Sequence, residues 1–181
     1  MSHPLVIANW KMNLPSKGIS EWVLDEMISS NEEKDFEEKT SFFKFMGVCP
    51  PISHLSEFKT LMNFGHFGSQ DISRFQDGAK TGDISADMII DRGCTFSIIG
   101  HSERREFHNE TNDVVSEKLK ICLEKNILPV VCIGECLEDY NNGDTLDVLE
   151  NQLKEIFSSI ISENKLIVAY EPIWALSLIH I

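Results

Sequence analysis

The stretch Leu166-Ile-Val-Ala-Tyr170 is followed directly by Glu171 and then by Pro172-Ile-Trp-Ala175. An apolar run of this length between polar segments predicts a strand that is buried on both faces, as in a parallel sheet. An unpaired carboxylate would be too costly inside such a core. Because Pro172 restricts the residue before it to extended backbone, we expect Glu171 to project from the carboxyl end of the strand, at the mouth of the sheet.

The rest of the chain alternates between strand-like and helix-like patterns. The strand-like runs are Leu5–Trp10, Phe42–Cys49, Asn63–Ser69, Thr95–Gly100, Ile127–Ile133 and Leu166–Tyr170. The helix-like segments are Ile19–Ile28, Ile52–Met62, Ala86–Asp91, Asp113–Glu124 and Thr145–Ile161. This alternation predicts a parallel sheet with right-handed crossovers.

The last two helical segments carry the clearest apolar stripes. The stripes are Val114, Val115, Leu119, Cys122 and Leu123, and then Leu146, Leu149, Leu153, Ile156, Phe157 and Ile160. Thr111 and Asp144 precede these segments, and we expect them to be N-caps.

Two architectures fit six βα units: an open, doubly wound sheet or a shortened (β/α)₈ barrel. In both, the functional residues lie at the carboxyl ends of the strands. The polar residues expected there are Asn9, Lys11, His101, Ser102, Glu103, Gly134, Glu135 and Glu171. Neither a G-x-G-x-x-G motif after the first strand nor a P-loop is present in the sequence, so nucleotide-phosphate binding has no support.

Together these side chains suit proton abstraction beside a carbonyl group. Glu171 offers a base, His101 can polarise or protonate an oxygen, Lys11 adds positive charge and Asn9 donates a hydrogen bond. The segment Ser102–Arg105 predicts a helical turn whose positive end would keep the His101 imidazole neutral.

Composition excludes several classes of protein. The chain has 181 residues, 42% of them hydrophobic, which suffices for one sizeable core. A net charge of −13 argues against a nucleic acid or an anionic membrane surface as partner. Five cysteines without framework spacing favour reduced thiols in a cytoplasmic protein.

Four sequence blocks carry a resemblance to a known family. They are Ala8-Asn-Trp-Lys-Met-Asn13, Ile99-Gly-His-Ser-Glu-Arg-Arg105, Cys132-Ile-Gly-Glu135 and Ala169-Tyr-Glu-Pro-Ile-Trp-Ala175. In order and spacing they resemble triosephosphate isomerase, with Gln70-Asp71 resembling the bacterial type. The resemblance implies a (β/α)₈ TIM barrel, truncated here to about six βα units.

The resemblance also implies an activity. The family interconverts dihydroxyacetone phosphate and glyceraldehyde 3-phosphate in glycolysis and gluconeogenesis, without metal or organic cofactor. It makes Glu171 the base, His101 the electrophile, and Asn9 and Lys11 substrate-binding residues.

Three further residues would support the site by the same resemblance. Glu103 would hold Lys11, and Glu135 would bond Trp174 in the first hinge of a mobile lid. The resemblance further implies a homodimer in which a loop containing Thr81 docks into the neighbouring subunit.

Each residue also has an ordinary interpretation when it is taken alone. Glu171 would be a solvated carboxylate, His101 a structural hydrogen-bonder, Lys11 a surface residue and Asn9 a turn residue. Cys132 and Cys136 are spaced like metal ligands, but Cys132 lies in an apolar run and the sequence has no second pair. His101, Glu103 and His108 could imitate a zinc site, but their spacing is irregular. We therefore expect no metal.

Beyond Ala175 the chain departs from the family pattern. We expect residues 1–175 to form an incomplete barrel domain and residues 176–181 to be a tail outside the family. That tail is what the triplets CTG TCT CTT ATA CAC ATC encode, which resemble a transposon end used to fragment DNA; a frameshift or early stop is the alternative. The second functional hypothesis is therefore an inactive fragment without the lid and phosphate-binding loops.

Overall fold

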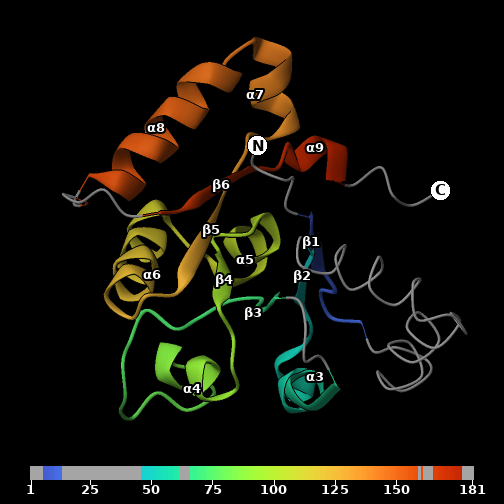
Figure 1. Ribbon diagram of the computed structural model, residues 1–181. Coiled ribbons are helices and arrows are strands. Elements are labelled where there is room, and N and C mark those ends of the chain that lie inside the picture. The colour runs from blue at the N-terminus through green and yellow to red at the C-terminus, as the bar shows by residue number, and fades with distance from the viewer. Residues whose placement is uncertain (1–5, 14–45, 62–65, 159, 161–164, 177–181) are drawn as a thin grey trace, which may run out of the picture. The chain divides into compact units, whose positions relative to one another are not determined.

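The computed structural model describes residues 6–13, 46–61, 66–158, 160 and 165–176, and the expected helix at Ile19–Ile28 lies outside them. Figure 1 shows strands and helices alternating along the chain. The chain forms two compact units, Met1–Gln70 with Met88–Phe96, and Asp71–Asp87 with Ser97–Ile181. Each is described separately below.

The first unit contains three neighbouring strands, β1 (Val6–Asn9), β2 (Met46–Cys49) and β3 (His66–Ser69). The pairs β1–β2 and β2–β3 are parallel, with Asn9 opposite Cys49. A short 3₁₀ turn, η1 (Ile52–His54), leads into α3 (Leu55–Leu61). The ring of Phe96 packs so closely on Gly47 and Gly68 that neither position has room for a Cβ.

The second unit contains β4 (Phe96–Ile99, whose first residue belongs to the first unit), β5 (Leu128–Ile133) and β6 (Ile167–Tyr170). The pair β5–β6 is parallel, with Ile133 opposite Tyr170. Its helices are α5 (Ser102–His108), α6 (Asn112–Glu124), α7 (Leu137–Asn142), α8 (Thr145–Phe157) and α9 (Ile173–Leu176). Helix α4 (Ala86–Asp91) joins the two units.

The stripe expected on α6 is largely confirmed. Val115, Leu119 and Cys122 are fully buried, and α6 packs on both β5 and α8. The Thr111 side chain accepts a hydrogen bond from the Val114 N–H, so Thr111 is the N-cap.

The expectations for α8 are confirmed only in part. Asp144 occupies the N-cap position but makes no capping bond with its side chain; only its carbonyl accepts the N–H of Val148. Leu146 is 79% exposed because α8 buries its last turn, where Ile156 is fully enclosed, and not its first turn. The preceding α7 was not predicted, since its sequence Leu-Glu-Asp-Tyr-Asn-Asn has no apolar period.

The expectation that β6 is buried on both faces is also wrong. Its residues alternate between intermediate and exposed, and Val168 and Tyr170 are 43% and 51% exposed. In the described part of the chain β6 pairs only with β5, so it lies at an edge. The hydrophobic run alone could not distinguish an edge strand from an enclosed one.

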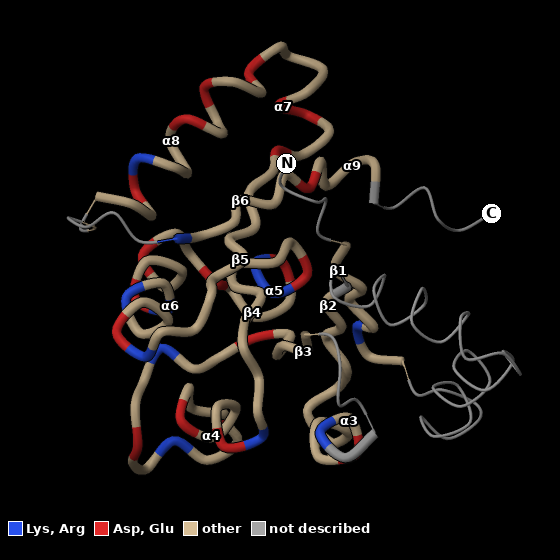
Figure 2. The backbone as a smooth tube through the Cα atoms, in the orientation of Figure 1, with Lys and Arg blue, Asp and Glu red and all other residues tan. Residues whose placement is uncertain are grey.

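Acidic residues predominate along α7 and α8, as Figure 2 shows. An anionic ligand must therefore be attracted by local donors and not by this surface. In the described residues, no helix is long and apolar enough to cross a membrane.

Candidate functional site

The second unit brings His101 and Glu171 together. Nε2 of His101 lies 3.5 Å from Oε1 of Glu171, and the two side chains are 7% and 21% exposed. His101 follows β4 and Glu171 follows β6, so two strand ends deliver them to one place. The second carboxylate oxygen of Glu171 is buried and has no hydrogen-bond partner among the described residues. A carboxylate held in this way keeps an acceptor oxygen available for a proton.

The imidazole of His101 is fixed by the start of α5. His101 is the N-cap residue of this helix, and its Nδ1 accepts the backbone N–H of Glu103 at 3.2 Å. A nitrogen that accepts a hydrogen bond carries no proton, so the neutral ring carries its proton on Nε2. That proton faces Glu171. The carboxylate of Glu103 lies 3.6 Å from Nδ1, on the other side of the ring.

Gly134 determines where Glu171 can lie. The backbone N–H of Glu171 donates to the carbonyl of Ile133 at 2.8 Å, which extends the pairing of β6 with β5 beyond the strand end. A Cβ on Gly134 would overlap the carbonyl oxygen of Glu171. The segment carrying Glu171 therefore passes directly over a residue that has no side chain.

Glu135 is almost completely buried and holds the segment after Glu171. Its Oε1 accepts hydrogen bonds from Trp174 Nε1 and Tyr170 OH, both at 3.0 Å, and its carbonyl accepts the N–H of Ile173. Burial raises the pKa of Glu135, but hydrogen bonds from Trp174, a backbone N–H and Tyr170 outweigh burial, so the pKa lies below its ordinary value of 4.5. The charged carboxylate is thus the form that the fold stabilises. Trp174 also stacks on Tyr140 of α7, with ring centroids 4.3 Å apart.

Arg105 joins the ends of β4 and β5. Its guanidinium donates to the carbonyl oxygens of Gly100 at 2.8 Å and Cys132 at 3.3 Å, and to Asn112 Oδ1 at 2.7 Å. Burial lowers the pKa of Arg105, while the charges of Cys132, Glu110 and Glu171 act in the opposite direction. A small hollow that is open to solvent adjoins this side chain; its lining comprises Gly100, Ser102, Arg105, Cys132, Ile133, Gly134, Glu171 and Ile173.

The first unit holds Asn9 and Lys11 in a tight turn. Asn9 Oδ1 accepts the N–H of Lys11 at 3.0 Å, and Gln70 Nε2 donates to the carbonyl oxygens of Lys11 and Cys49. The φ angle of Lys11 is 51°, in the left-handed region that residues other than glycine rarely adopt. Asn9 and Lys11 belong to one unit and His101 and Glu171 to the other, so their assembly into one site, and the pairing of Lys11 with Glu103, stay predictions.

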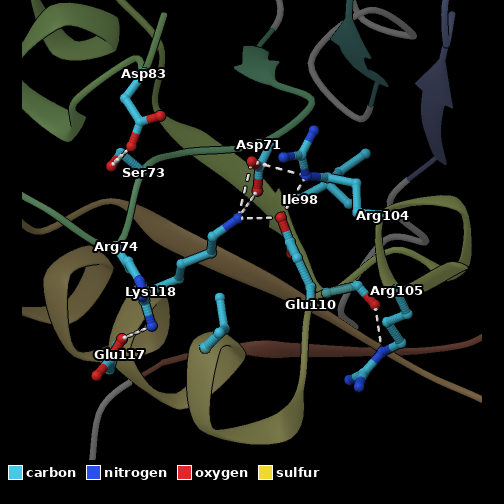
Figure 3. Close-up of polar contacts among 12 residues, drawn as sticks. Asp71, Ser73, Arg74, Asp83, Ile98, Arg104, Arg105, Glu110, Glu117 and Lys118 are labelled. Carbon is cyan, nitrogen blue, oxygen red and sulfur yellow. Dashed lines mark hydrogen bonds and ion pairs between the residues drawn. The ribbon is translucent and has the colours of Figure 1, made fainter. Parts of the chain in front are cut away.

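The second unit also contains a largely buried ionic network. Figure 3 shows Lys118 and Arg104 between the carboxylates of Asp71 and Glu110, so that each cation contacts both anions. The four contacts measure 2.5 to 2.8 Å. Arg104 therefore forms ion pairs within the fold. Arg105 instead bonds carbonyl groups and an amide.

The loop between Asp71 and Ala86 exposes residues 76–83, Thr81 included. Ser73 Oγ donates to Asp83 Oδ2 at 2.6 Å and accepts the N–H of Phe75, while Lys80 lies 4.3 Å over the Phe75 ring. These contacts organise the loop from within.

All five cysteines are free, and Cys136 alone is exposed. Burial raises the pKa of Cys94 and Cys122 to about 12, so these thiols are poor nucleophiles. Among the residues that the structure describes, no group of three or more His, Cys, Asp or Glu side chains could hold a metal ion.

Sequence reasoning missed the residues that hold others in place, namely Gln70, Gln152 and Arg105. Gln152 left a signal, because it occupies the face of α8 shared by Leu149, Leu153 and Ile156, where a polar side chain needs a partner.

Comparison with known proteins agrees with this geometry. The sequence profile of the triosephosphate isomerase family matches residues 4–178. Over 97% of this chain and 69% of the relative, the chain is 39% identical to a triosephosphate isomerase of Alkaliphilus oremlandii. Over the same shares, it is 36% identical to one of Nitrosococcus oceani.

Among solved structures, the chain is similar to a triosephosphate isomerase of Bartonella henselae. The TM-score is 0.76 at 31% sequence identity, and the match covers 94% of this chain and 68% of the other. The expected fold, a (β/α)₈ barrel truncated to about six βα units, is confirmed.

Proposed function

This chain belongs to the triosephosphate isomerase family, and from that membership we propose that Glu171 and His101 interconvert dihydroxyacetone phosphate and D-glyceraldehyde 3-phosphate. The observation that carries the assignment of residues is the 3.5 Å approach of His101 Nε2 to Glu171 Oε1. A base and a proton donor at this separation can act on neighbouring atoms of one small substrate.

The reaction needs two proton exchanges and no change in the number of electrons. The Glu171 carboxylate takes the proton from C1 of dihydroxyacetone phosphate, while Nε2–H of His101 gives a proton to the carbonyl oxygen at C2. The resulting enediol then loses its O1 proton to His101 and receives the proton from Glu171 at C2. Both residues return to their starting state, and the ketose has become the aldose.

The tautomer of His101 supports its role as the proton donor. Nδ1 accepts the Glu103 N–H, so donation through Nε2 converts the neutral imidazole to imidazolate and never requires a positively charged imidazole. A neutral donor is suited to a weakly basic carbonyl, because its acidity is closer to that of the enediol it forms.

Lys11 and Asn9 are proposed to bind the substrate's oxygens. The left-handed backbone of Lys11, held by Asn9 and Gln70, supports this role, because strained residues persist where the surroundings fix them and often serve function. The Glu135–Trp174 bond is proposed to hold the hinge of a lid that closes over the substrate.

The test uses the complete protein that contains these residues. We expect purified protein to convert glyceraldehyde 3-phosphate, and Glu171→Gln and His101→Gln to lower kcat by roughly 10² to 10⁴ each with the fold intact. Glu138→Gln, an exposed carboxylate on α7, is the matched control. Near-normal turnover by Glu171→Gln would show that another group is the base.

We further propose that the complete protein is a homodimer whose 76–83 loop docks into the partner. The loop is exposed but internally organised, which lowers the entropy lost on docking. Thr81→Arg should shift the protein toward monomer in analytical ultracentrifugation and lower activity. A fully active wild-type monomer at micromolar concentration would refute this proposal.

The five free thiols and the net charge of −13 support a reducing, cytoplasmic location and argue against nucleic acid as a partner. Cell fractionation with an antibody to the complete protein tests the location.

A further inference from the structure

Gln152 of α8 binds the backbone of Gly134 through both ends of its side-chain amide. Oε1 accepts the Gly134 N–H at 3.0 Å, and Nε2 donates to the Gly134 carbonyl at 2.9 Å. The amide thus satisfies Gly134 much as a neighbouring strand would.

Gly134 lies at the centre of the contacts that position the segment after β6. The residue before it, Ile133, accepts the N–H of Glu171, and the residue after it, Glu135, accepts the N–H of Ile173. Gly134 itself lies against the Glu171 carbonyl with no room for a Cβ. A rotation of the Gly134 peptide would therefore move Glu171 and the bond between Glu135 and Trp174 together.

We propose that Gln152 is a positioning residue for the reaction, which fixes the Gly134 peptide and through it the carboxylate of Glu171. This inference rests on the proposed function. It assigns to α8, a helix that supplies no reacting group, the task of holding the base in line with the His101 proton donor.

The chemistry of the side chain makes the role specific. A glutamine supplies one donor and one acceptor with the spacing of a peptide group, and both are used. Glutamate keeps the acceptor and the size but places an oxygen against the Gly134 carbonyl. Methionine has a similar length and removes both bonds.

The experiment compares Gln152→Met and Gln152→Glu with Asn151→Met in the complete protein. Asn151 is the exposed neighbour on the same helix, so Asn151→Met introduces the same side chain away from Gly134. We expect both Gln152 variants to lower kcat by roughly 10- to 100-fold with KM unchanged within about twofold. The control should keep wild-type values.

A second readout does not depend on activity. In both Gln152 variants, the backbone amides of Glu171 and Ile173 should exchange with solvent faster, and the indole N–H resonance of Trp174 should shift. The Asn151 control should change neither. If the Gln152 variants keep wild-type kcat, or if these amides stay as protected as in the control, the inference is wrong.

The outcomes separate this inference from the function on which it rests. An inactive wild-type protein refutes the function, and amide exchange still decides whether Gln152 holds the segment. If Gln152→Met does not fold, Gln152→Glu, which preserves the volume and one hydrogen bond, decides the matter by the same two measurements.

Discussion

At the scale of single residues, the position of Glu171 depends on a neighbour that has no side chain. Gly134 lies under the Glu171 carbonyl, and the Glu171 N–H is bound by Ile133. The backbone of Glu171, the proposed base, is therefore held by two contacts that do not involve its carboxylate.

Gly134→Ala should consequently be more harmful than an ordinary glycine substitution. The added methyl group meets backbone and cannot be relieved by a rotamer change, so we expect a loss of about 1–3 kcal/mol in unfolding free energy. Gly143→Ala is the comparison, because φ is 82° but nothing lies within 4 Å; left-handed backbone alone costs about 1–2 kcal/mol. Urea unfolding measures both. A kcat unchanged in Gly134→Ala would contradict the coupling to Glu171.

The residue scale is also where sequence reasoning succeeds best. His101 and Glu171 were predicted as partners from their positions after strands, and the structure places them 3.5 Å apart. The side chains that bind the backbone next to them were not predicted. Gln152 and Arg105 act on backbone carbonyls and N–H groups, and such partners follow from three-dimensional proximity rather than from any spacing along the chain.

At the scale of elements, α6 and α8 form a contrast in how helices begin. Thr111 caps α6 with its hydroxyl, whereas Asp144 makes no capping bond with its side chain at the start of α8. The preceding α7 ends in left-handed Gly143, and the Asp144 N–H donates to the carbonyl of Asp139. Asp144 therefore belongs to the turn between α7 and α8, and its side chain does not cap α8.

Thr111→Ala should therefore lower the unfolding free energy by about 1 kcal/mol, because the Val114 N–H in the first turn of α6 loses its acceptor. Asp144→Ala should change it by less than about 0.5 kcal/mol, as for an exposed substitution away from special contacts. Chemical denaturation of the two variants in parallel measures the difference. Equal losses would mean that Asp144 contributes as a cap after all.

The failures at this scale have one cause. Leu146 and Val168 sit in apolar patterns that predict burial, yet both are exposed. A pattern reports which face of an element is apolar, whereas burial depends on what lies against that face. The core of α6, enclosed between β5 and α8, was predictable because neighbours on two sides cover it.

At the scale of the whole molecule, the ionic network ties distant parts of the chain together. Asp71 and Glu110 lie 47 and 8 positions before Lys118 in the sequence, but the three side chains meet in one cluster. Burial raises the pKa of Asp71 and outweighs the attraction of Lys118. For Glu110 burial acts in the same direction, but hydrogen bonds from Lys118 and Arg104 outweigh it, and the pKa is lowered. Two repelling carboxylates that share their cations titrate in this divided way.

Lys118→Met should cost on the order of 3 kcal/mol at pH 7, because two buried carboxylates lose a shared cation. Glu110 has a folded pKa below its ordinary 4.5, so its contribution is present above that value and is lost as pH falls through the folded pKa. Asp71 has a raised pKa in the folded state, so its contribution to the unfolding free energy changes with pH in the opposite sense. The difference in unfolding free energy between Lys118→Met and the wild type should therefore become smaller below pH 4.5.

Unfolding curves measured between pH 3 and 7 check this prediction. An effect of this size is easily measured, because the total stability of a domain is only about 5–15 kcal/mol. Arg74→Met, which breaks the exposed pair with Glu117, is the control and should cost no more than about 1 kcal/mol at any pH. A constant gap for Lys118→Met across the whole range would contradict the protonation argument.

At position 11, the left-handed backbone favours a residue other than the lysine that the proposed function requires. With φ at 51°, glycine or asparagine would fit the backbone better than lysine, and either would raise the melting temperature. A laboratory selection that rewards heat resistance alone would therefore discard the ammonium group proposed to meet the substrate. Directed evolution of this protein should score turnover together with heat resistance, because a more stable variant at position 11 would lack the ammonium group proposed to bind the substrate.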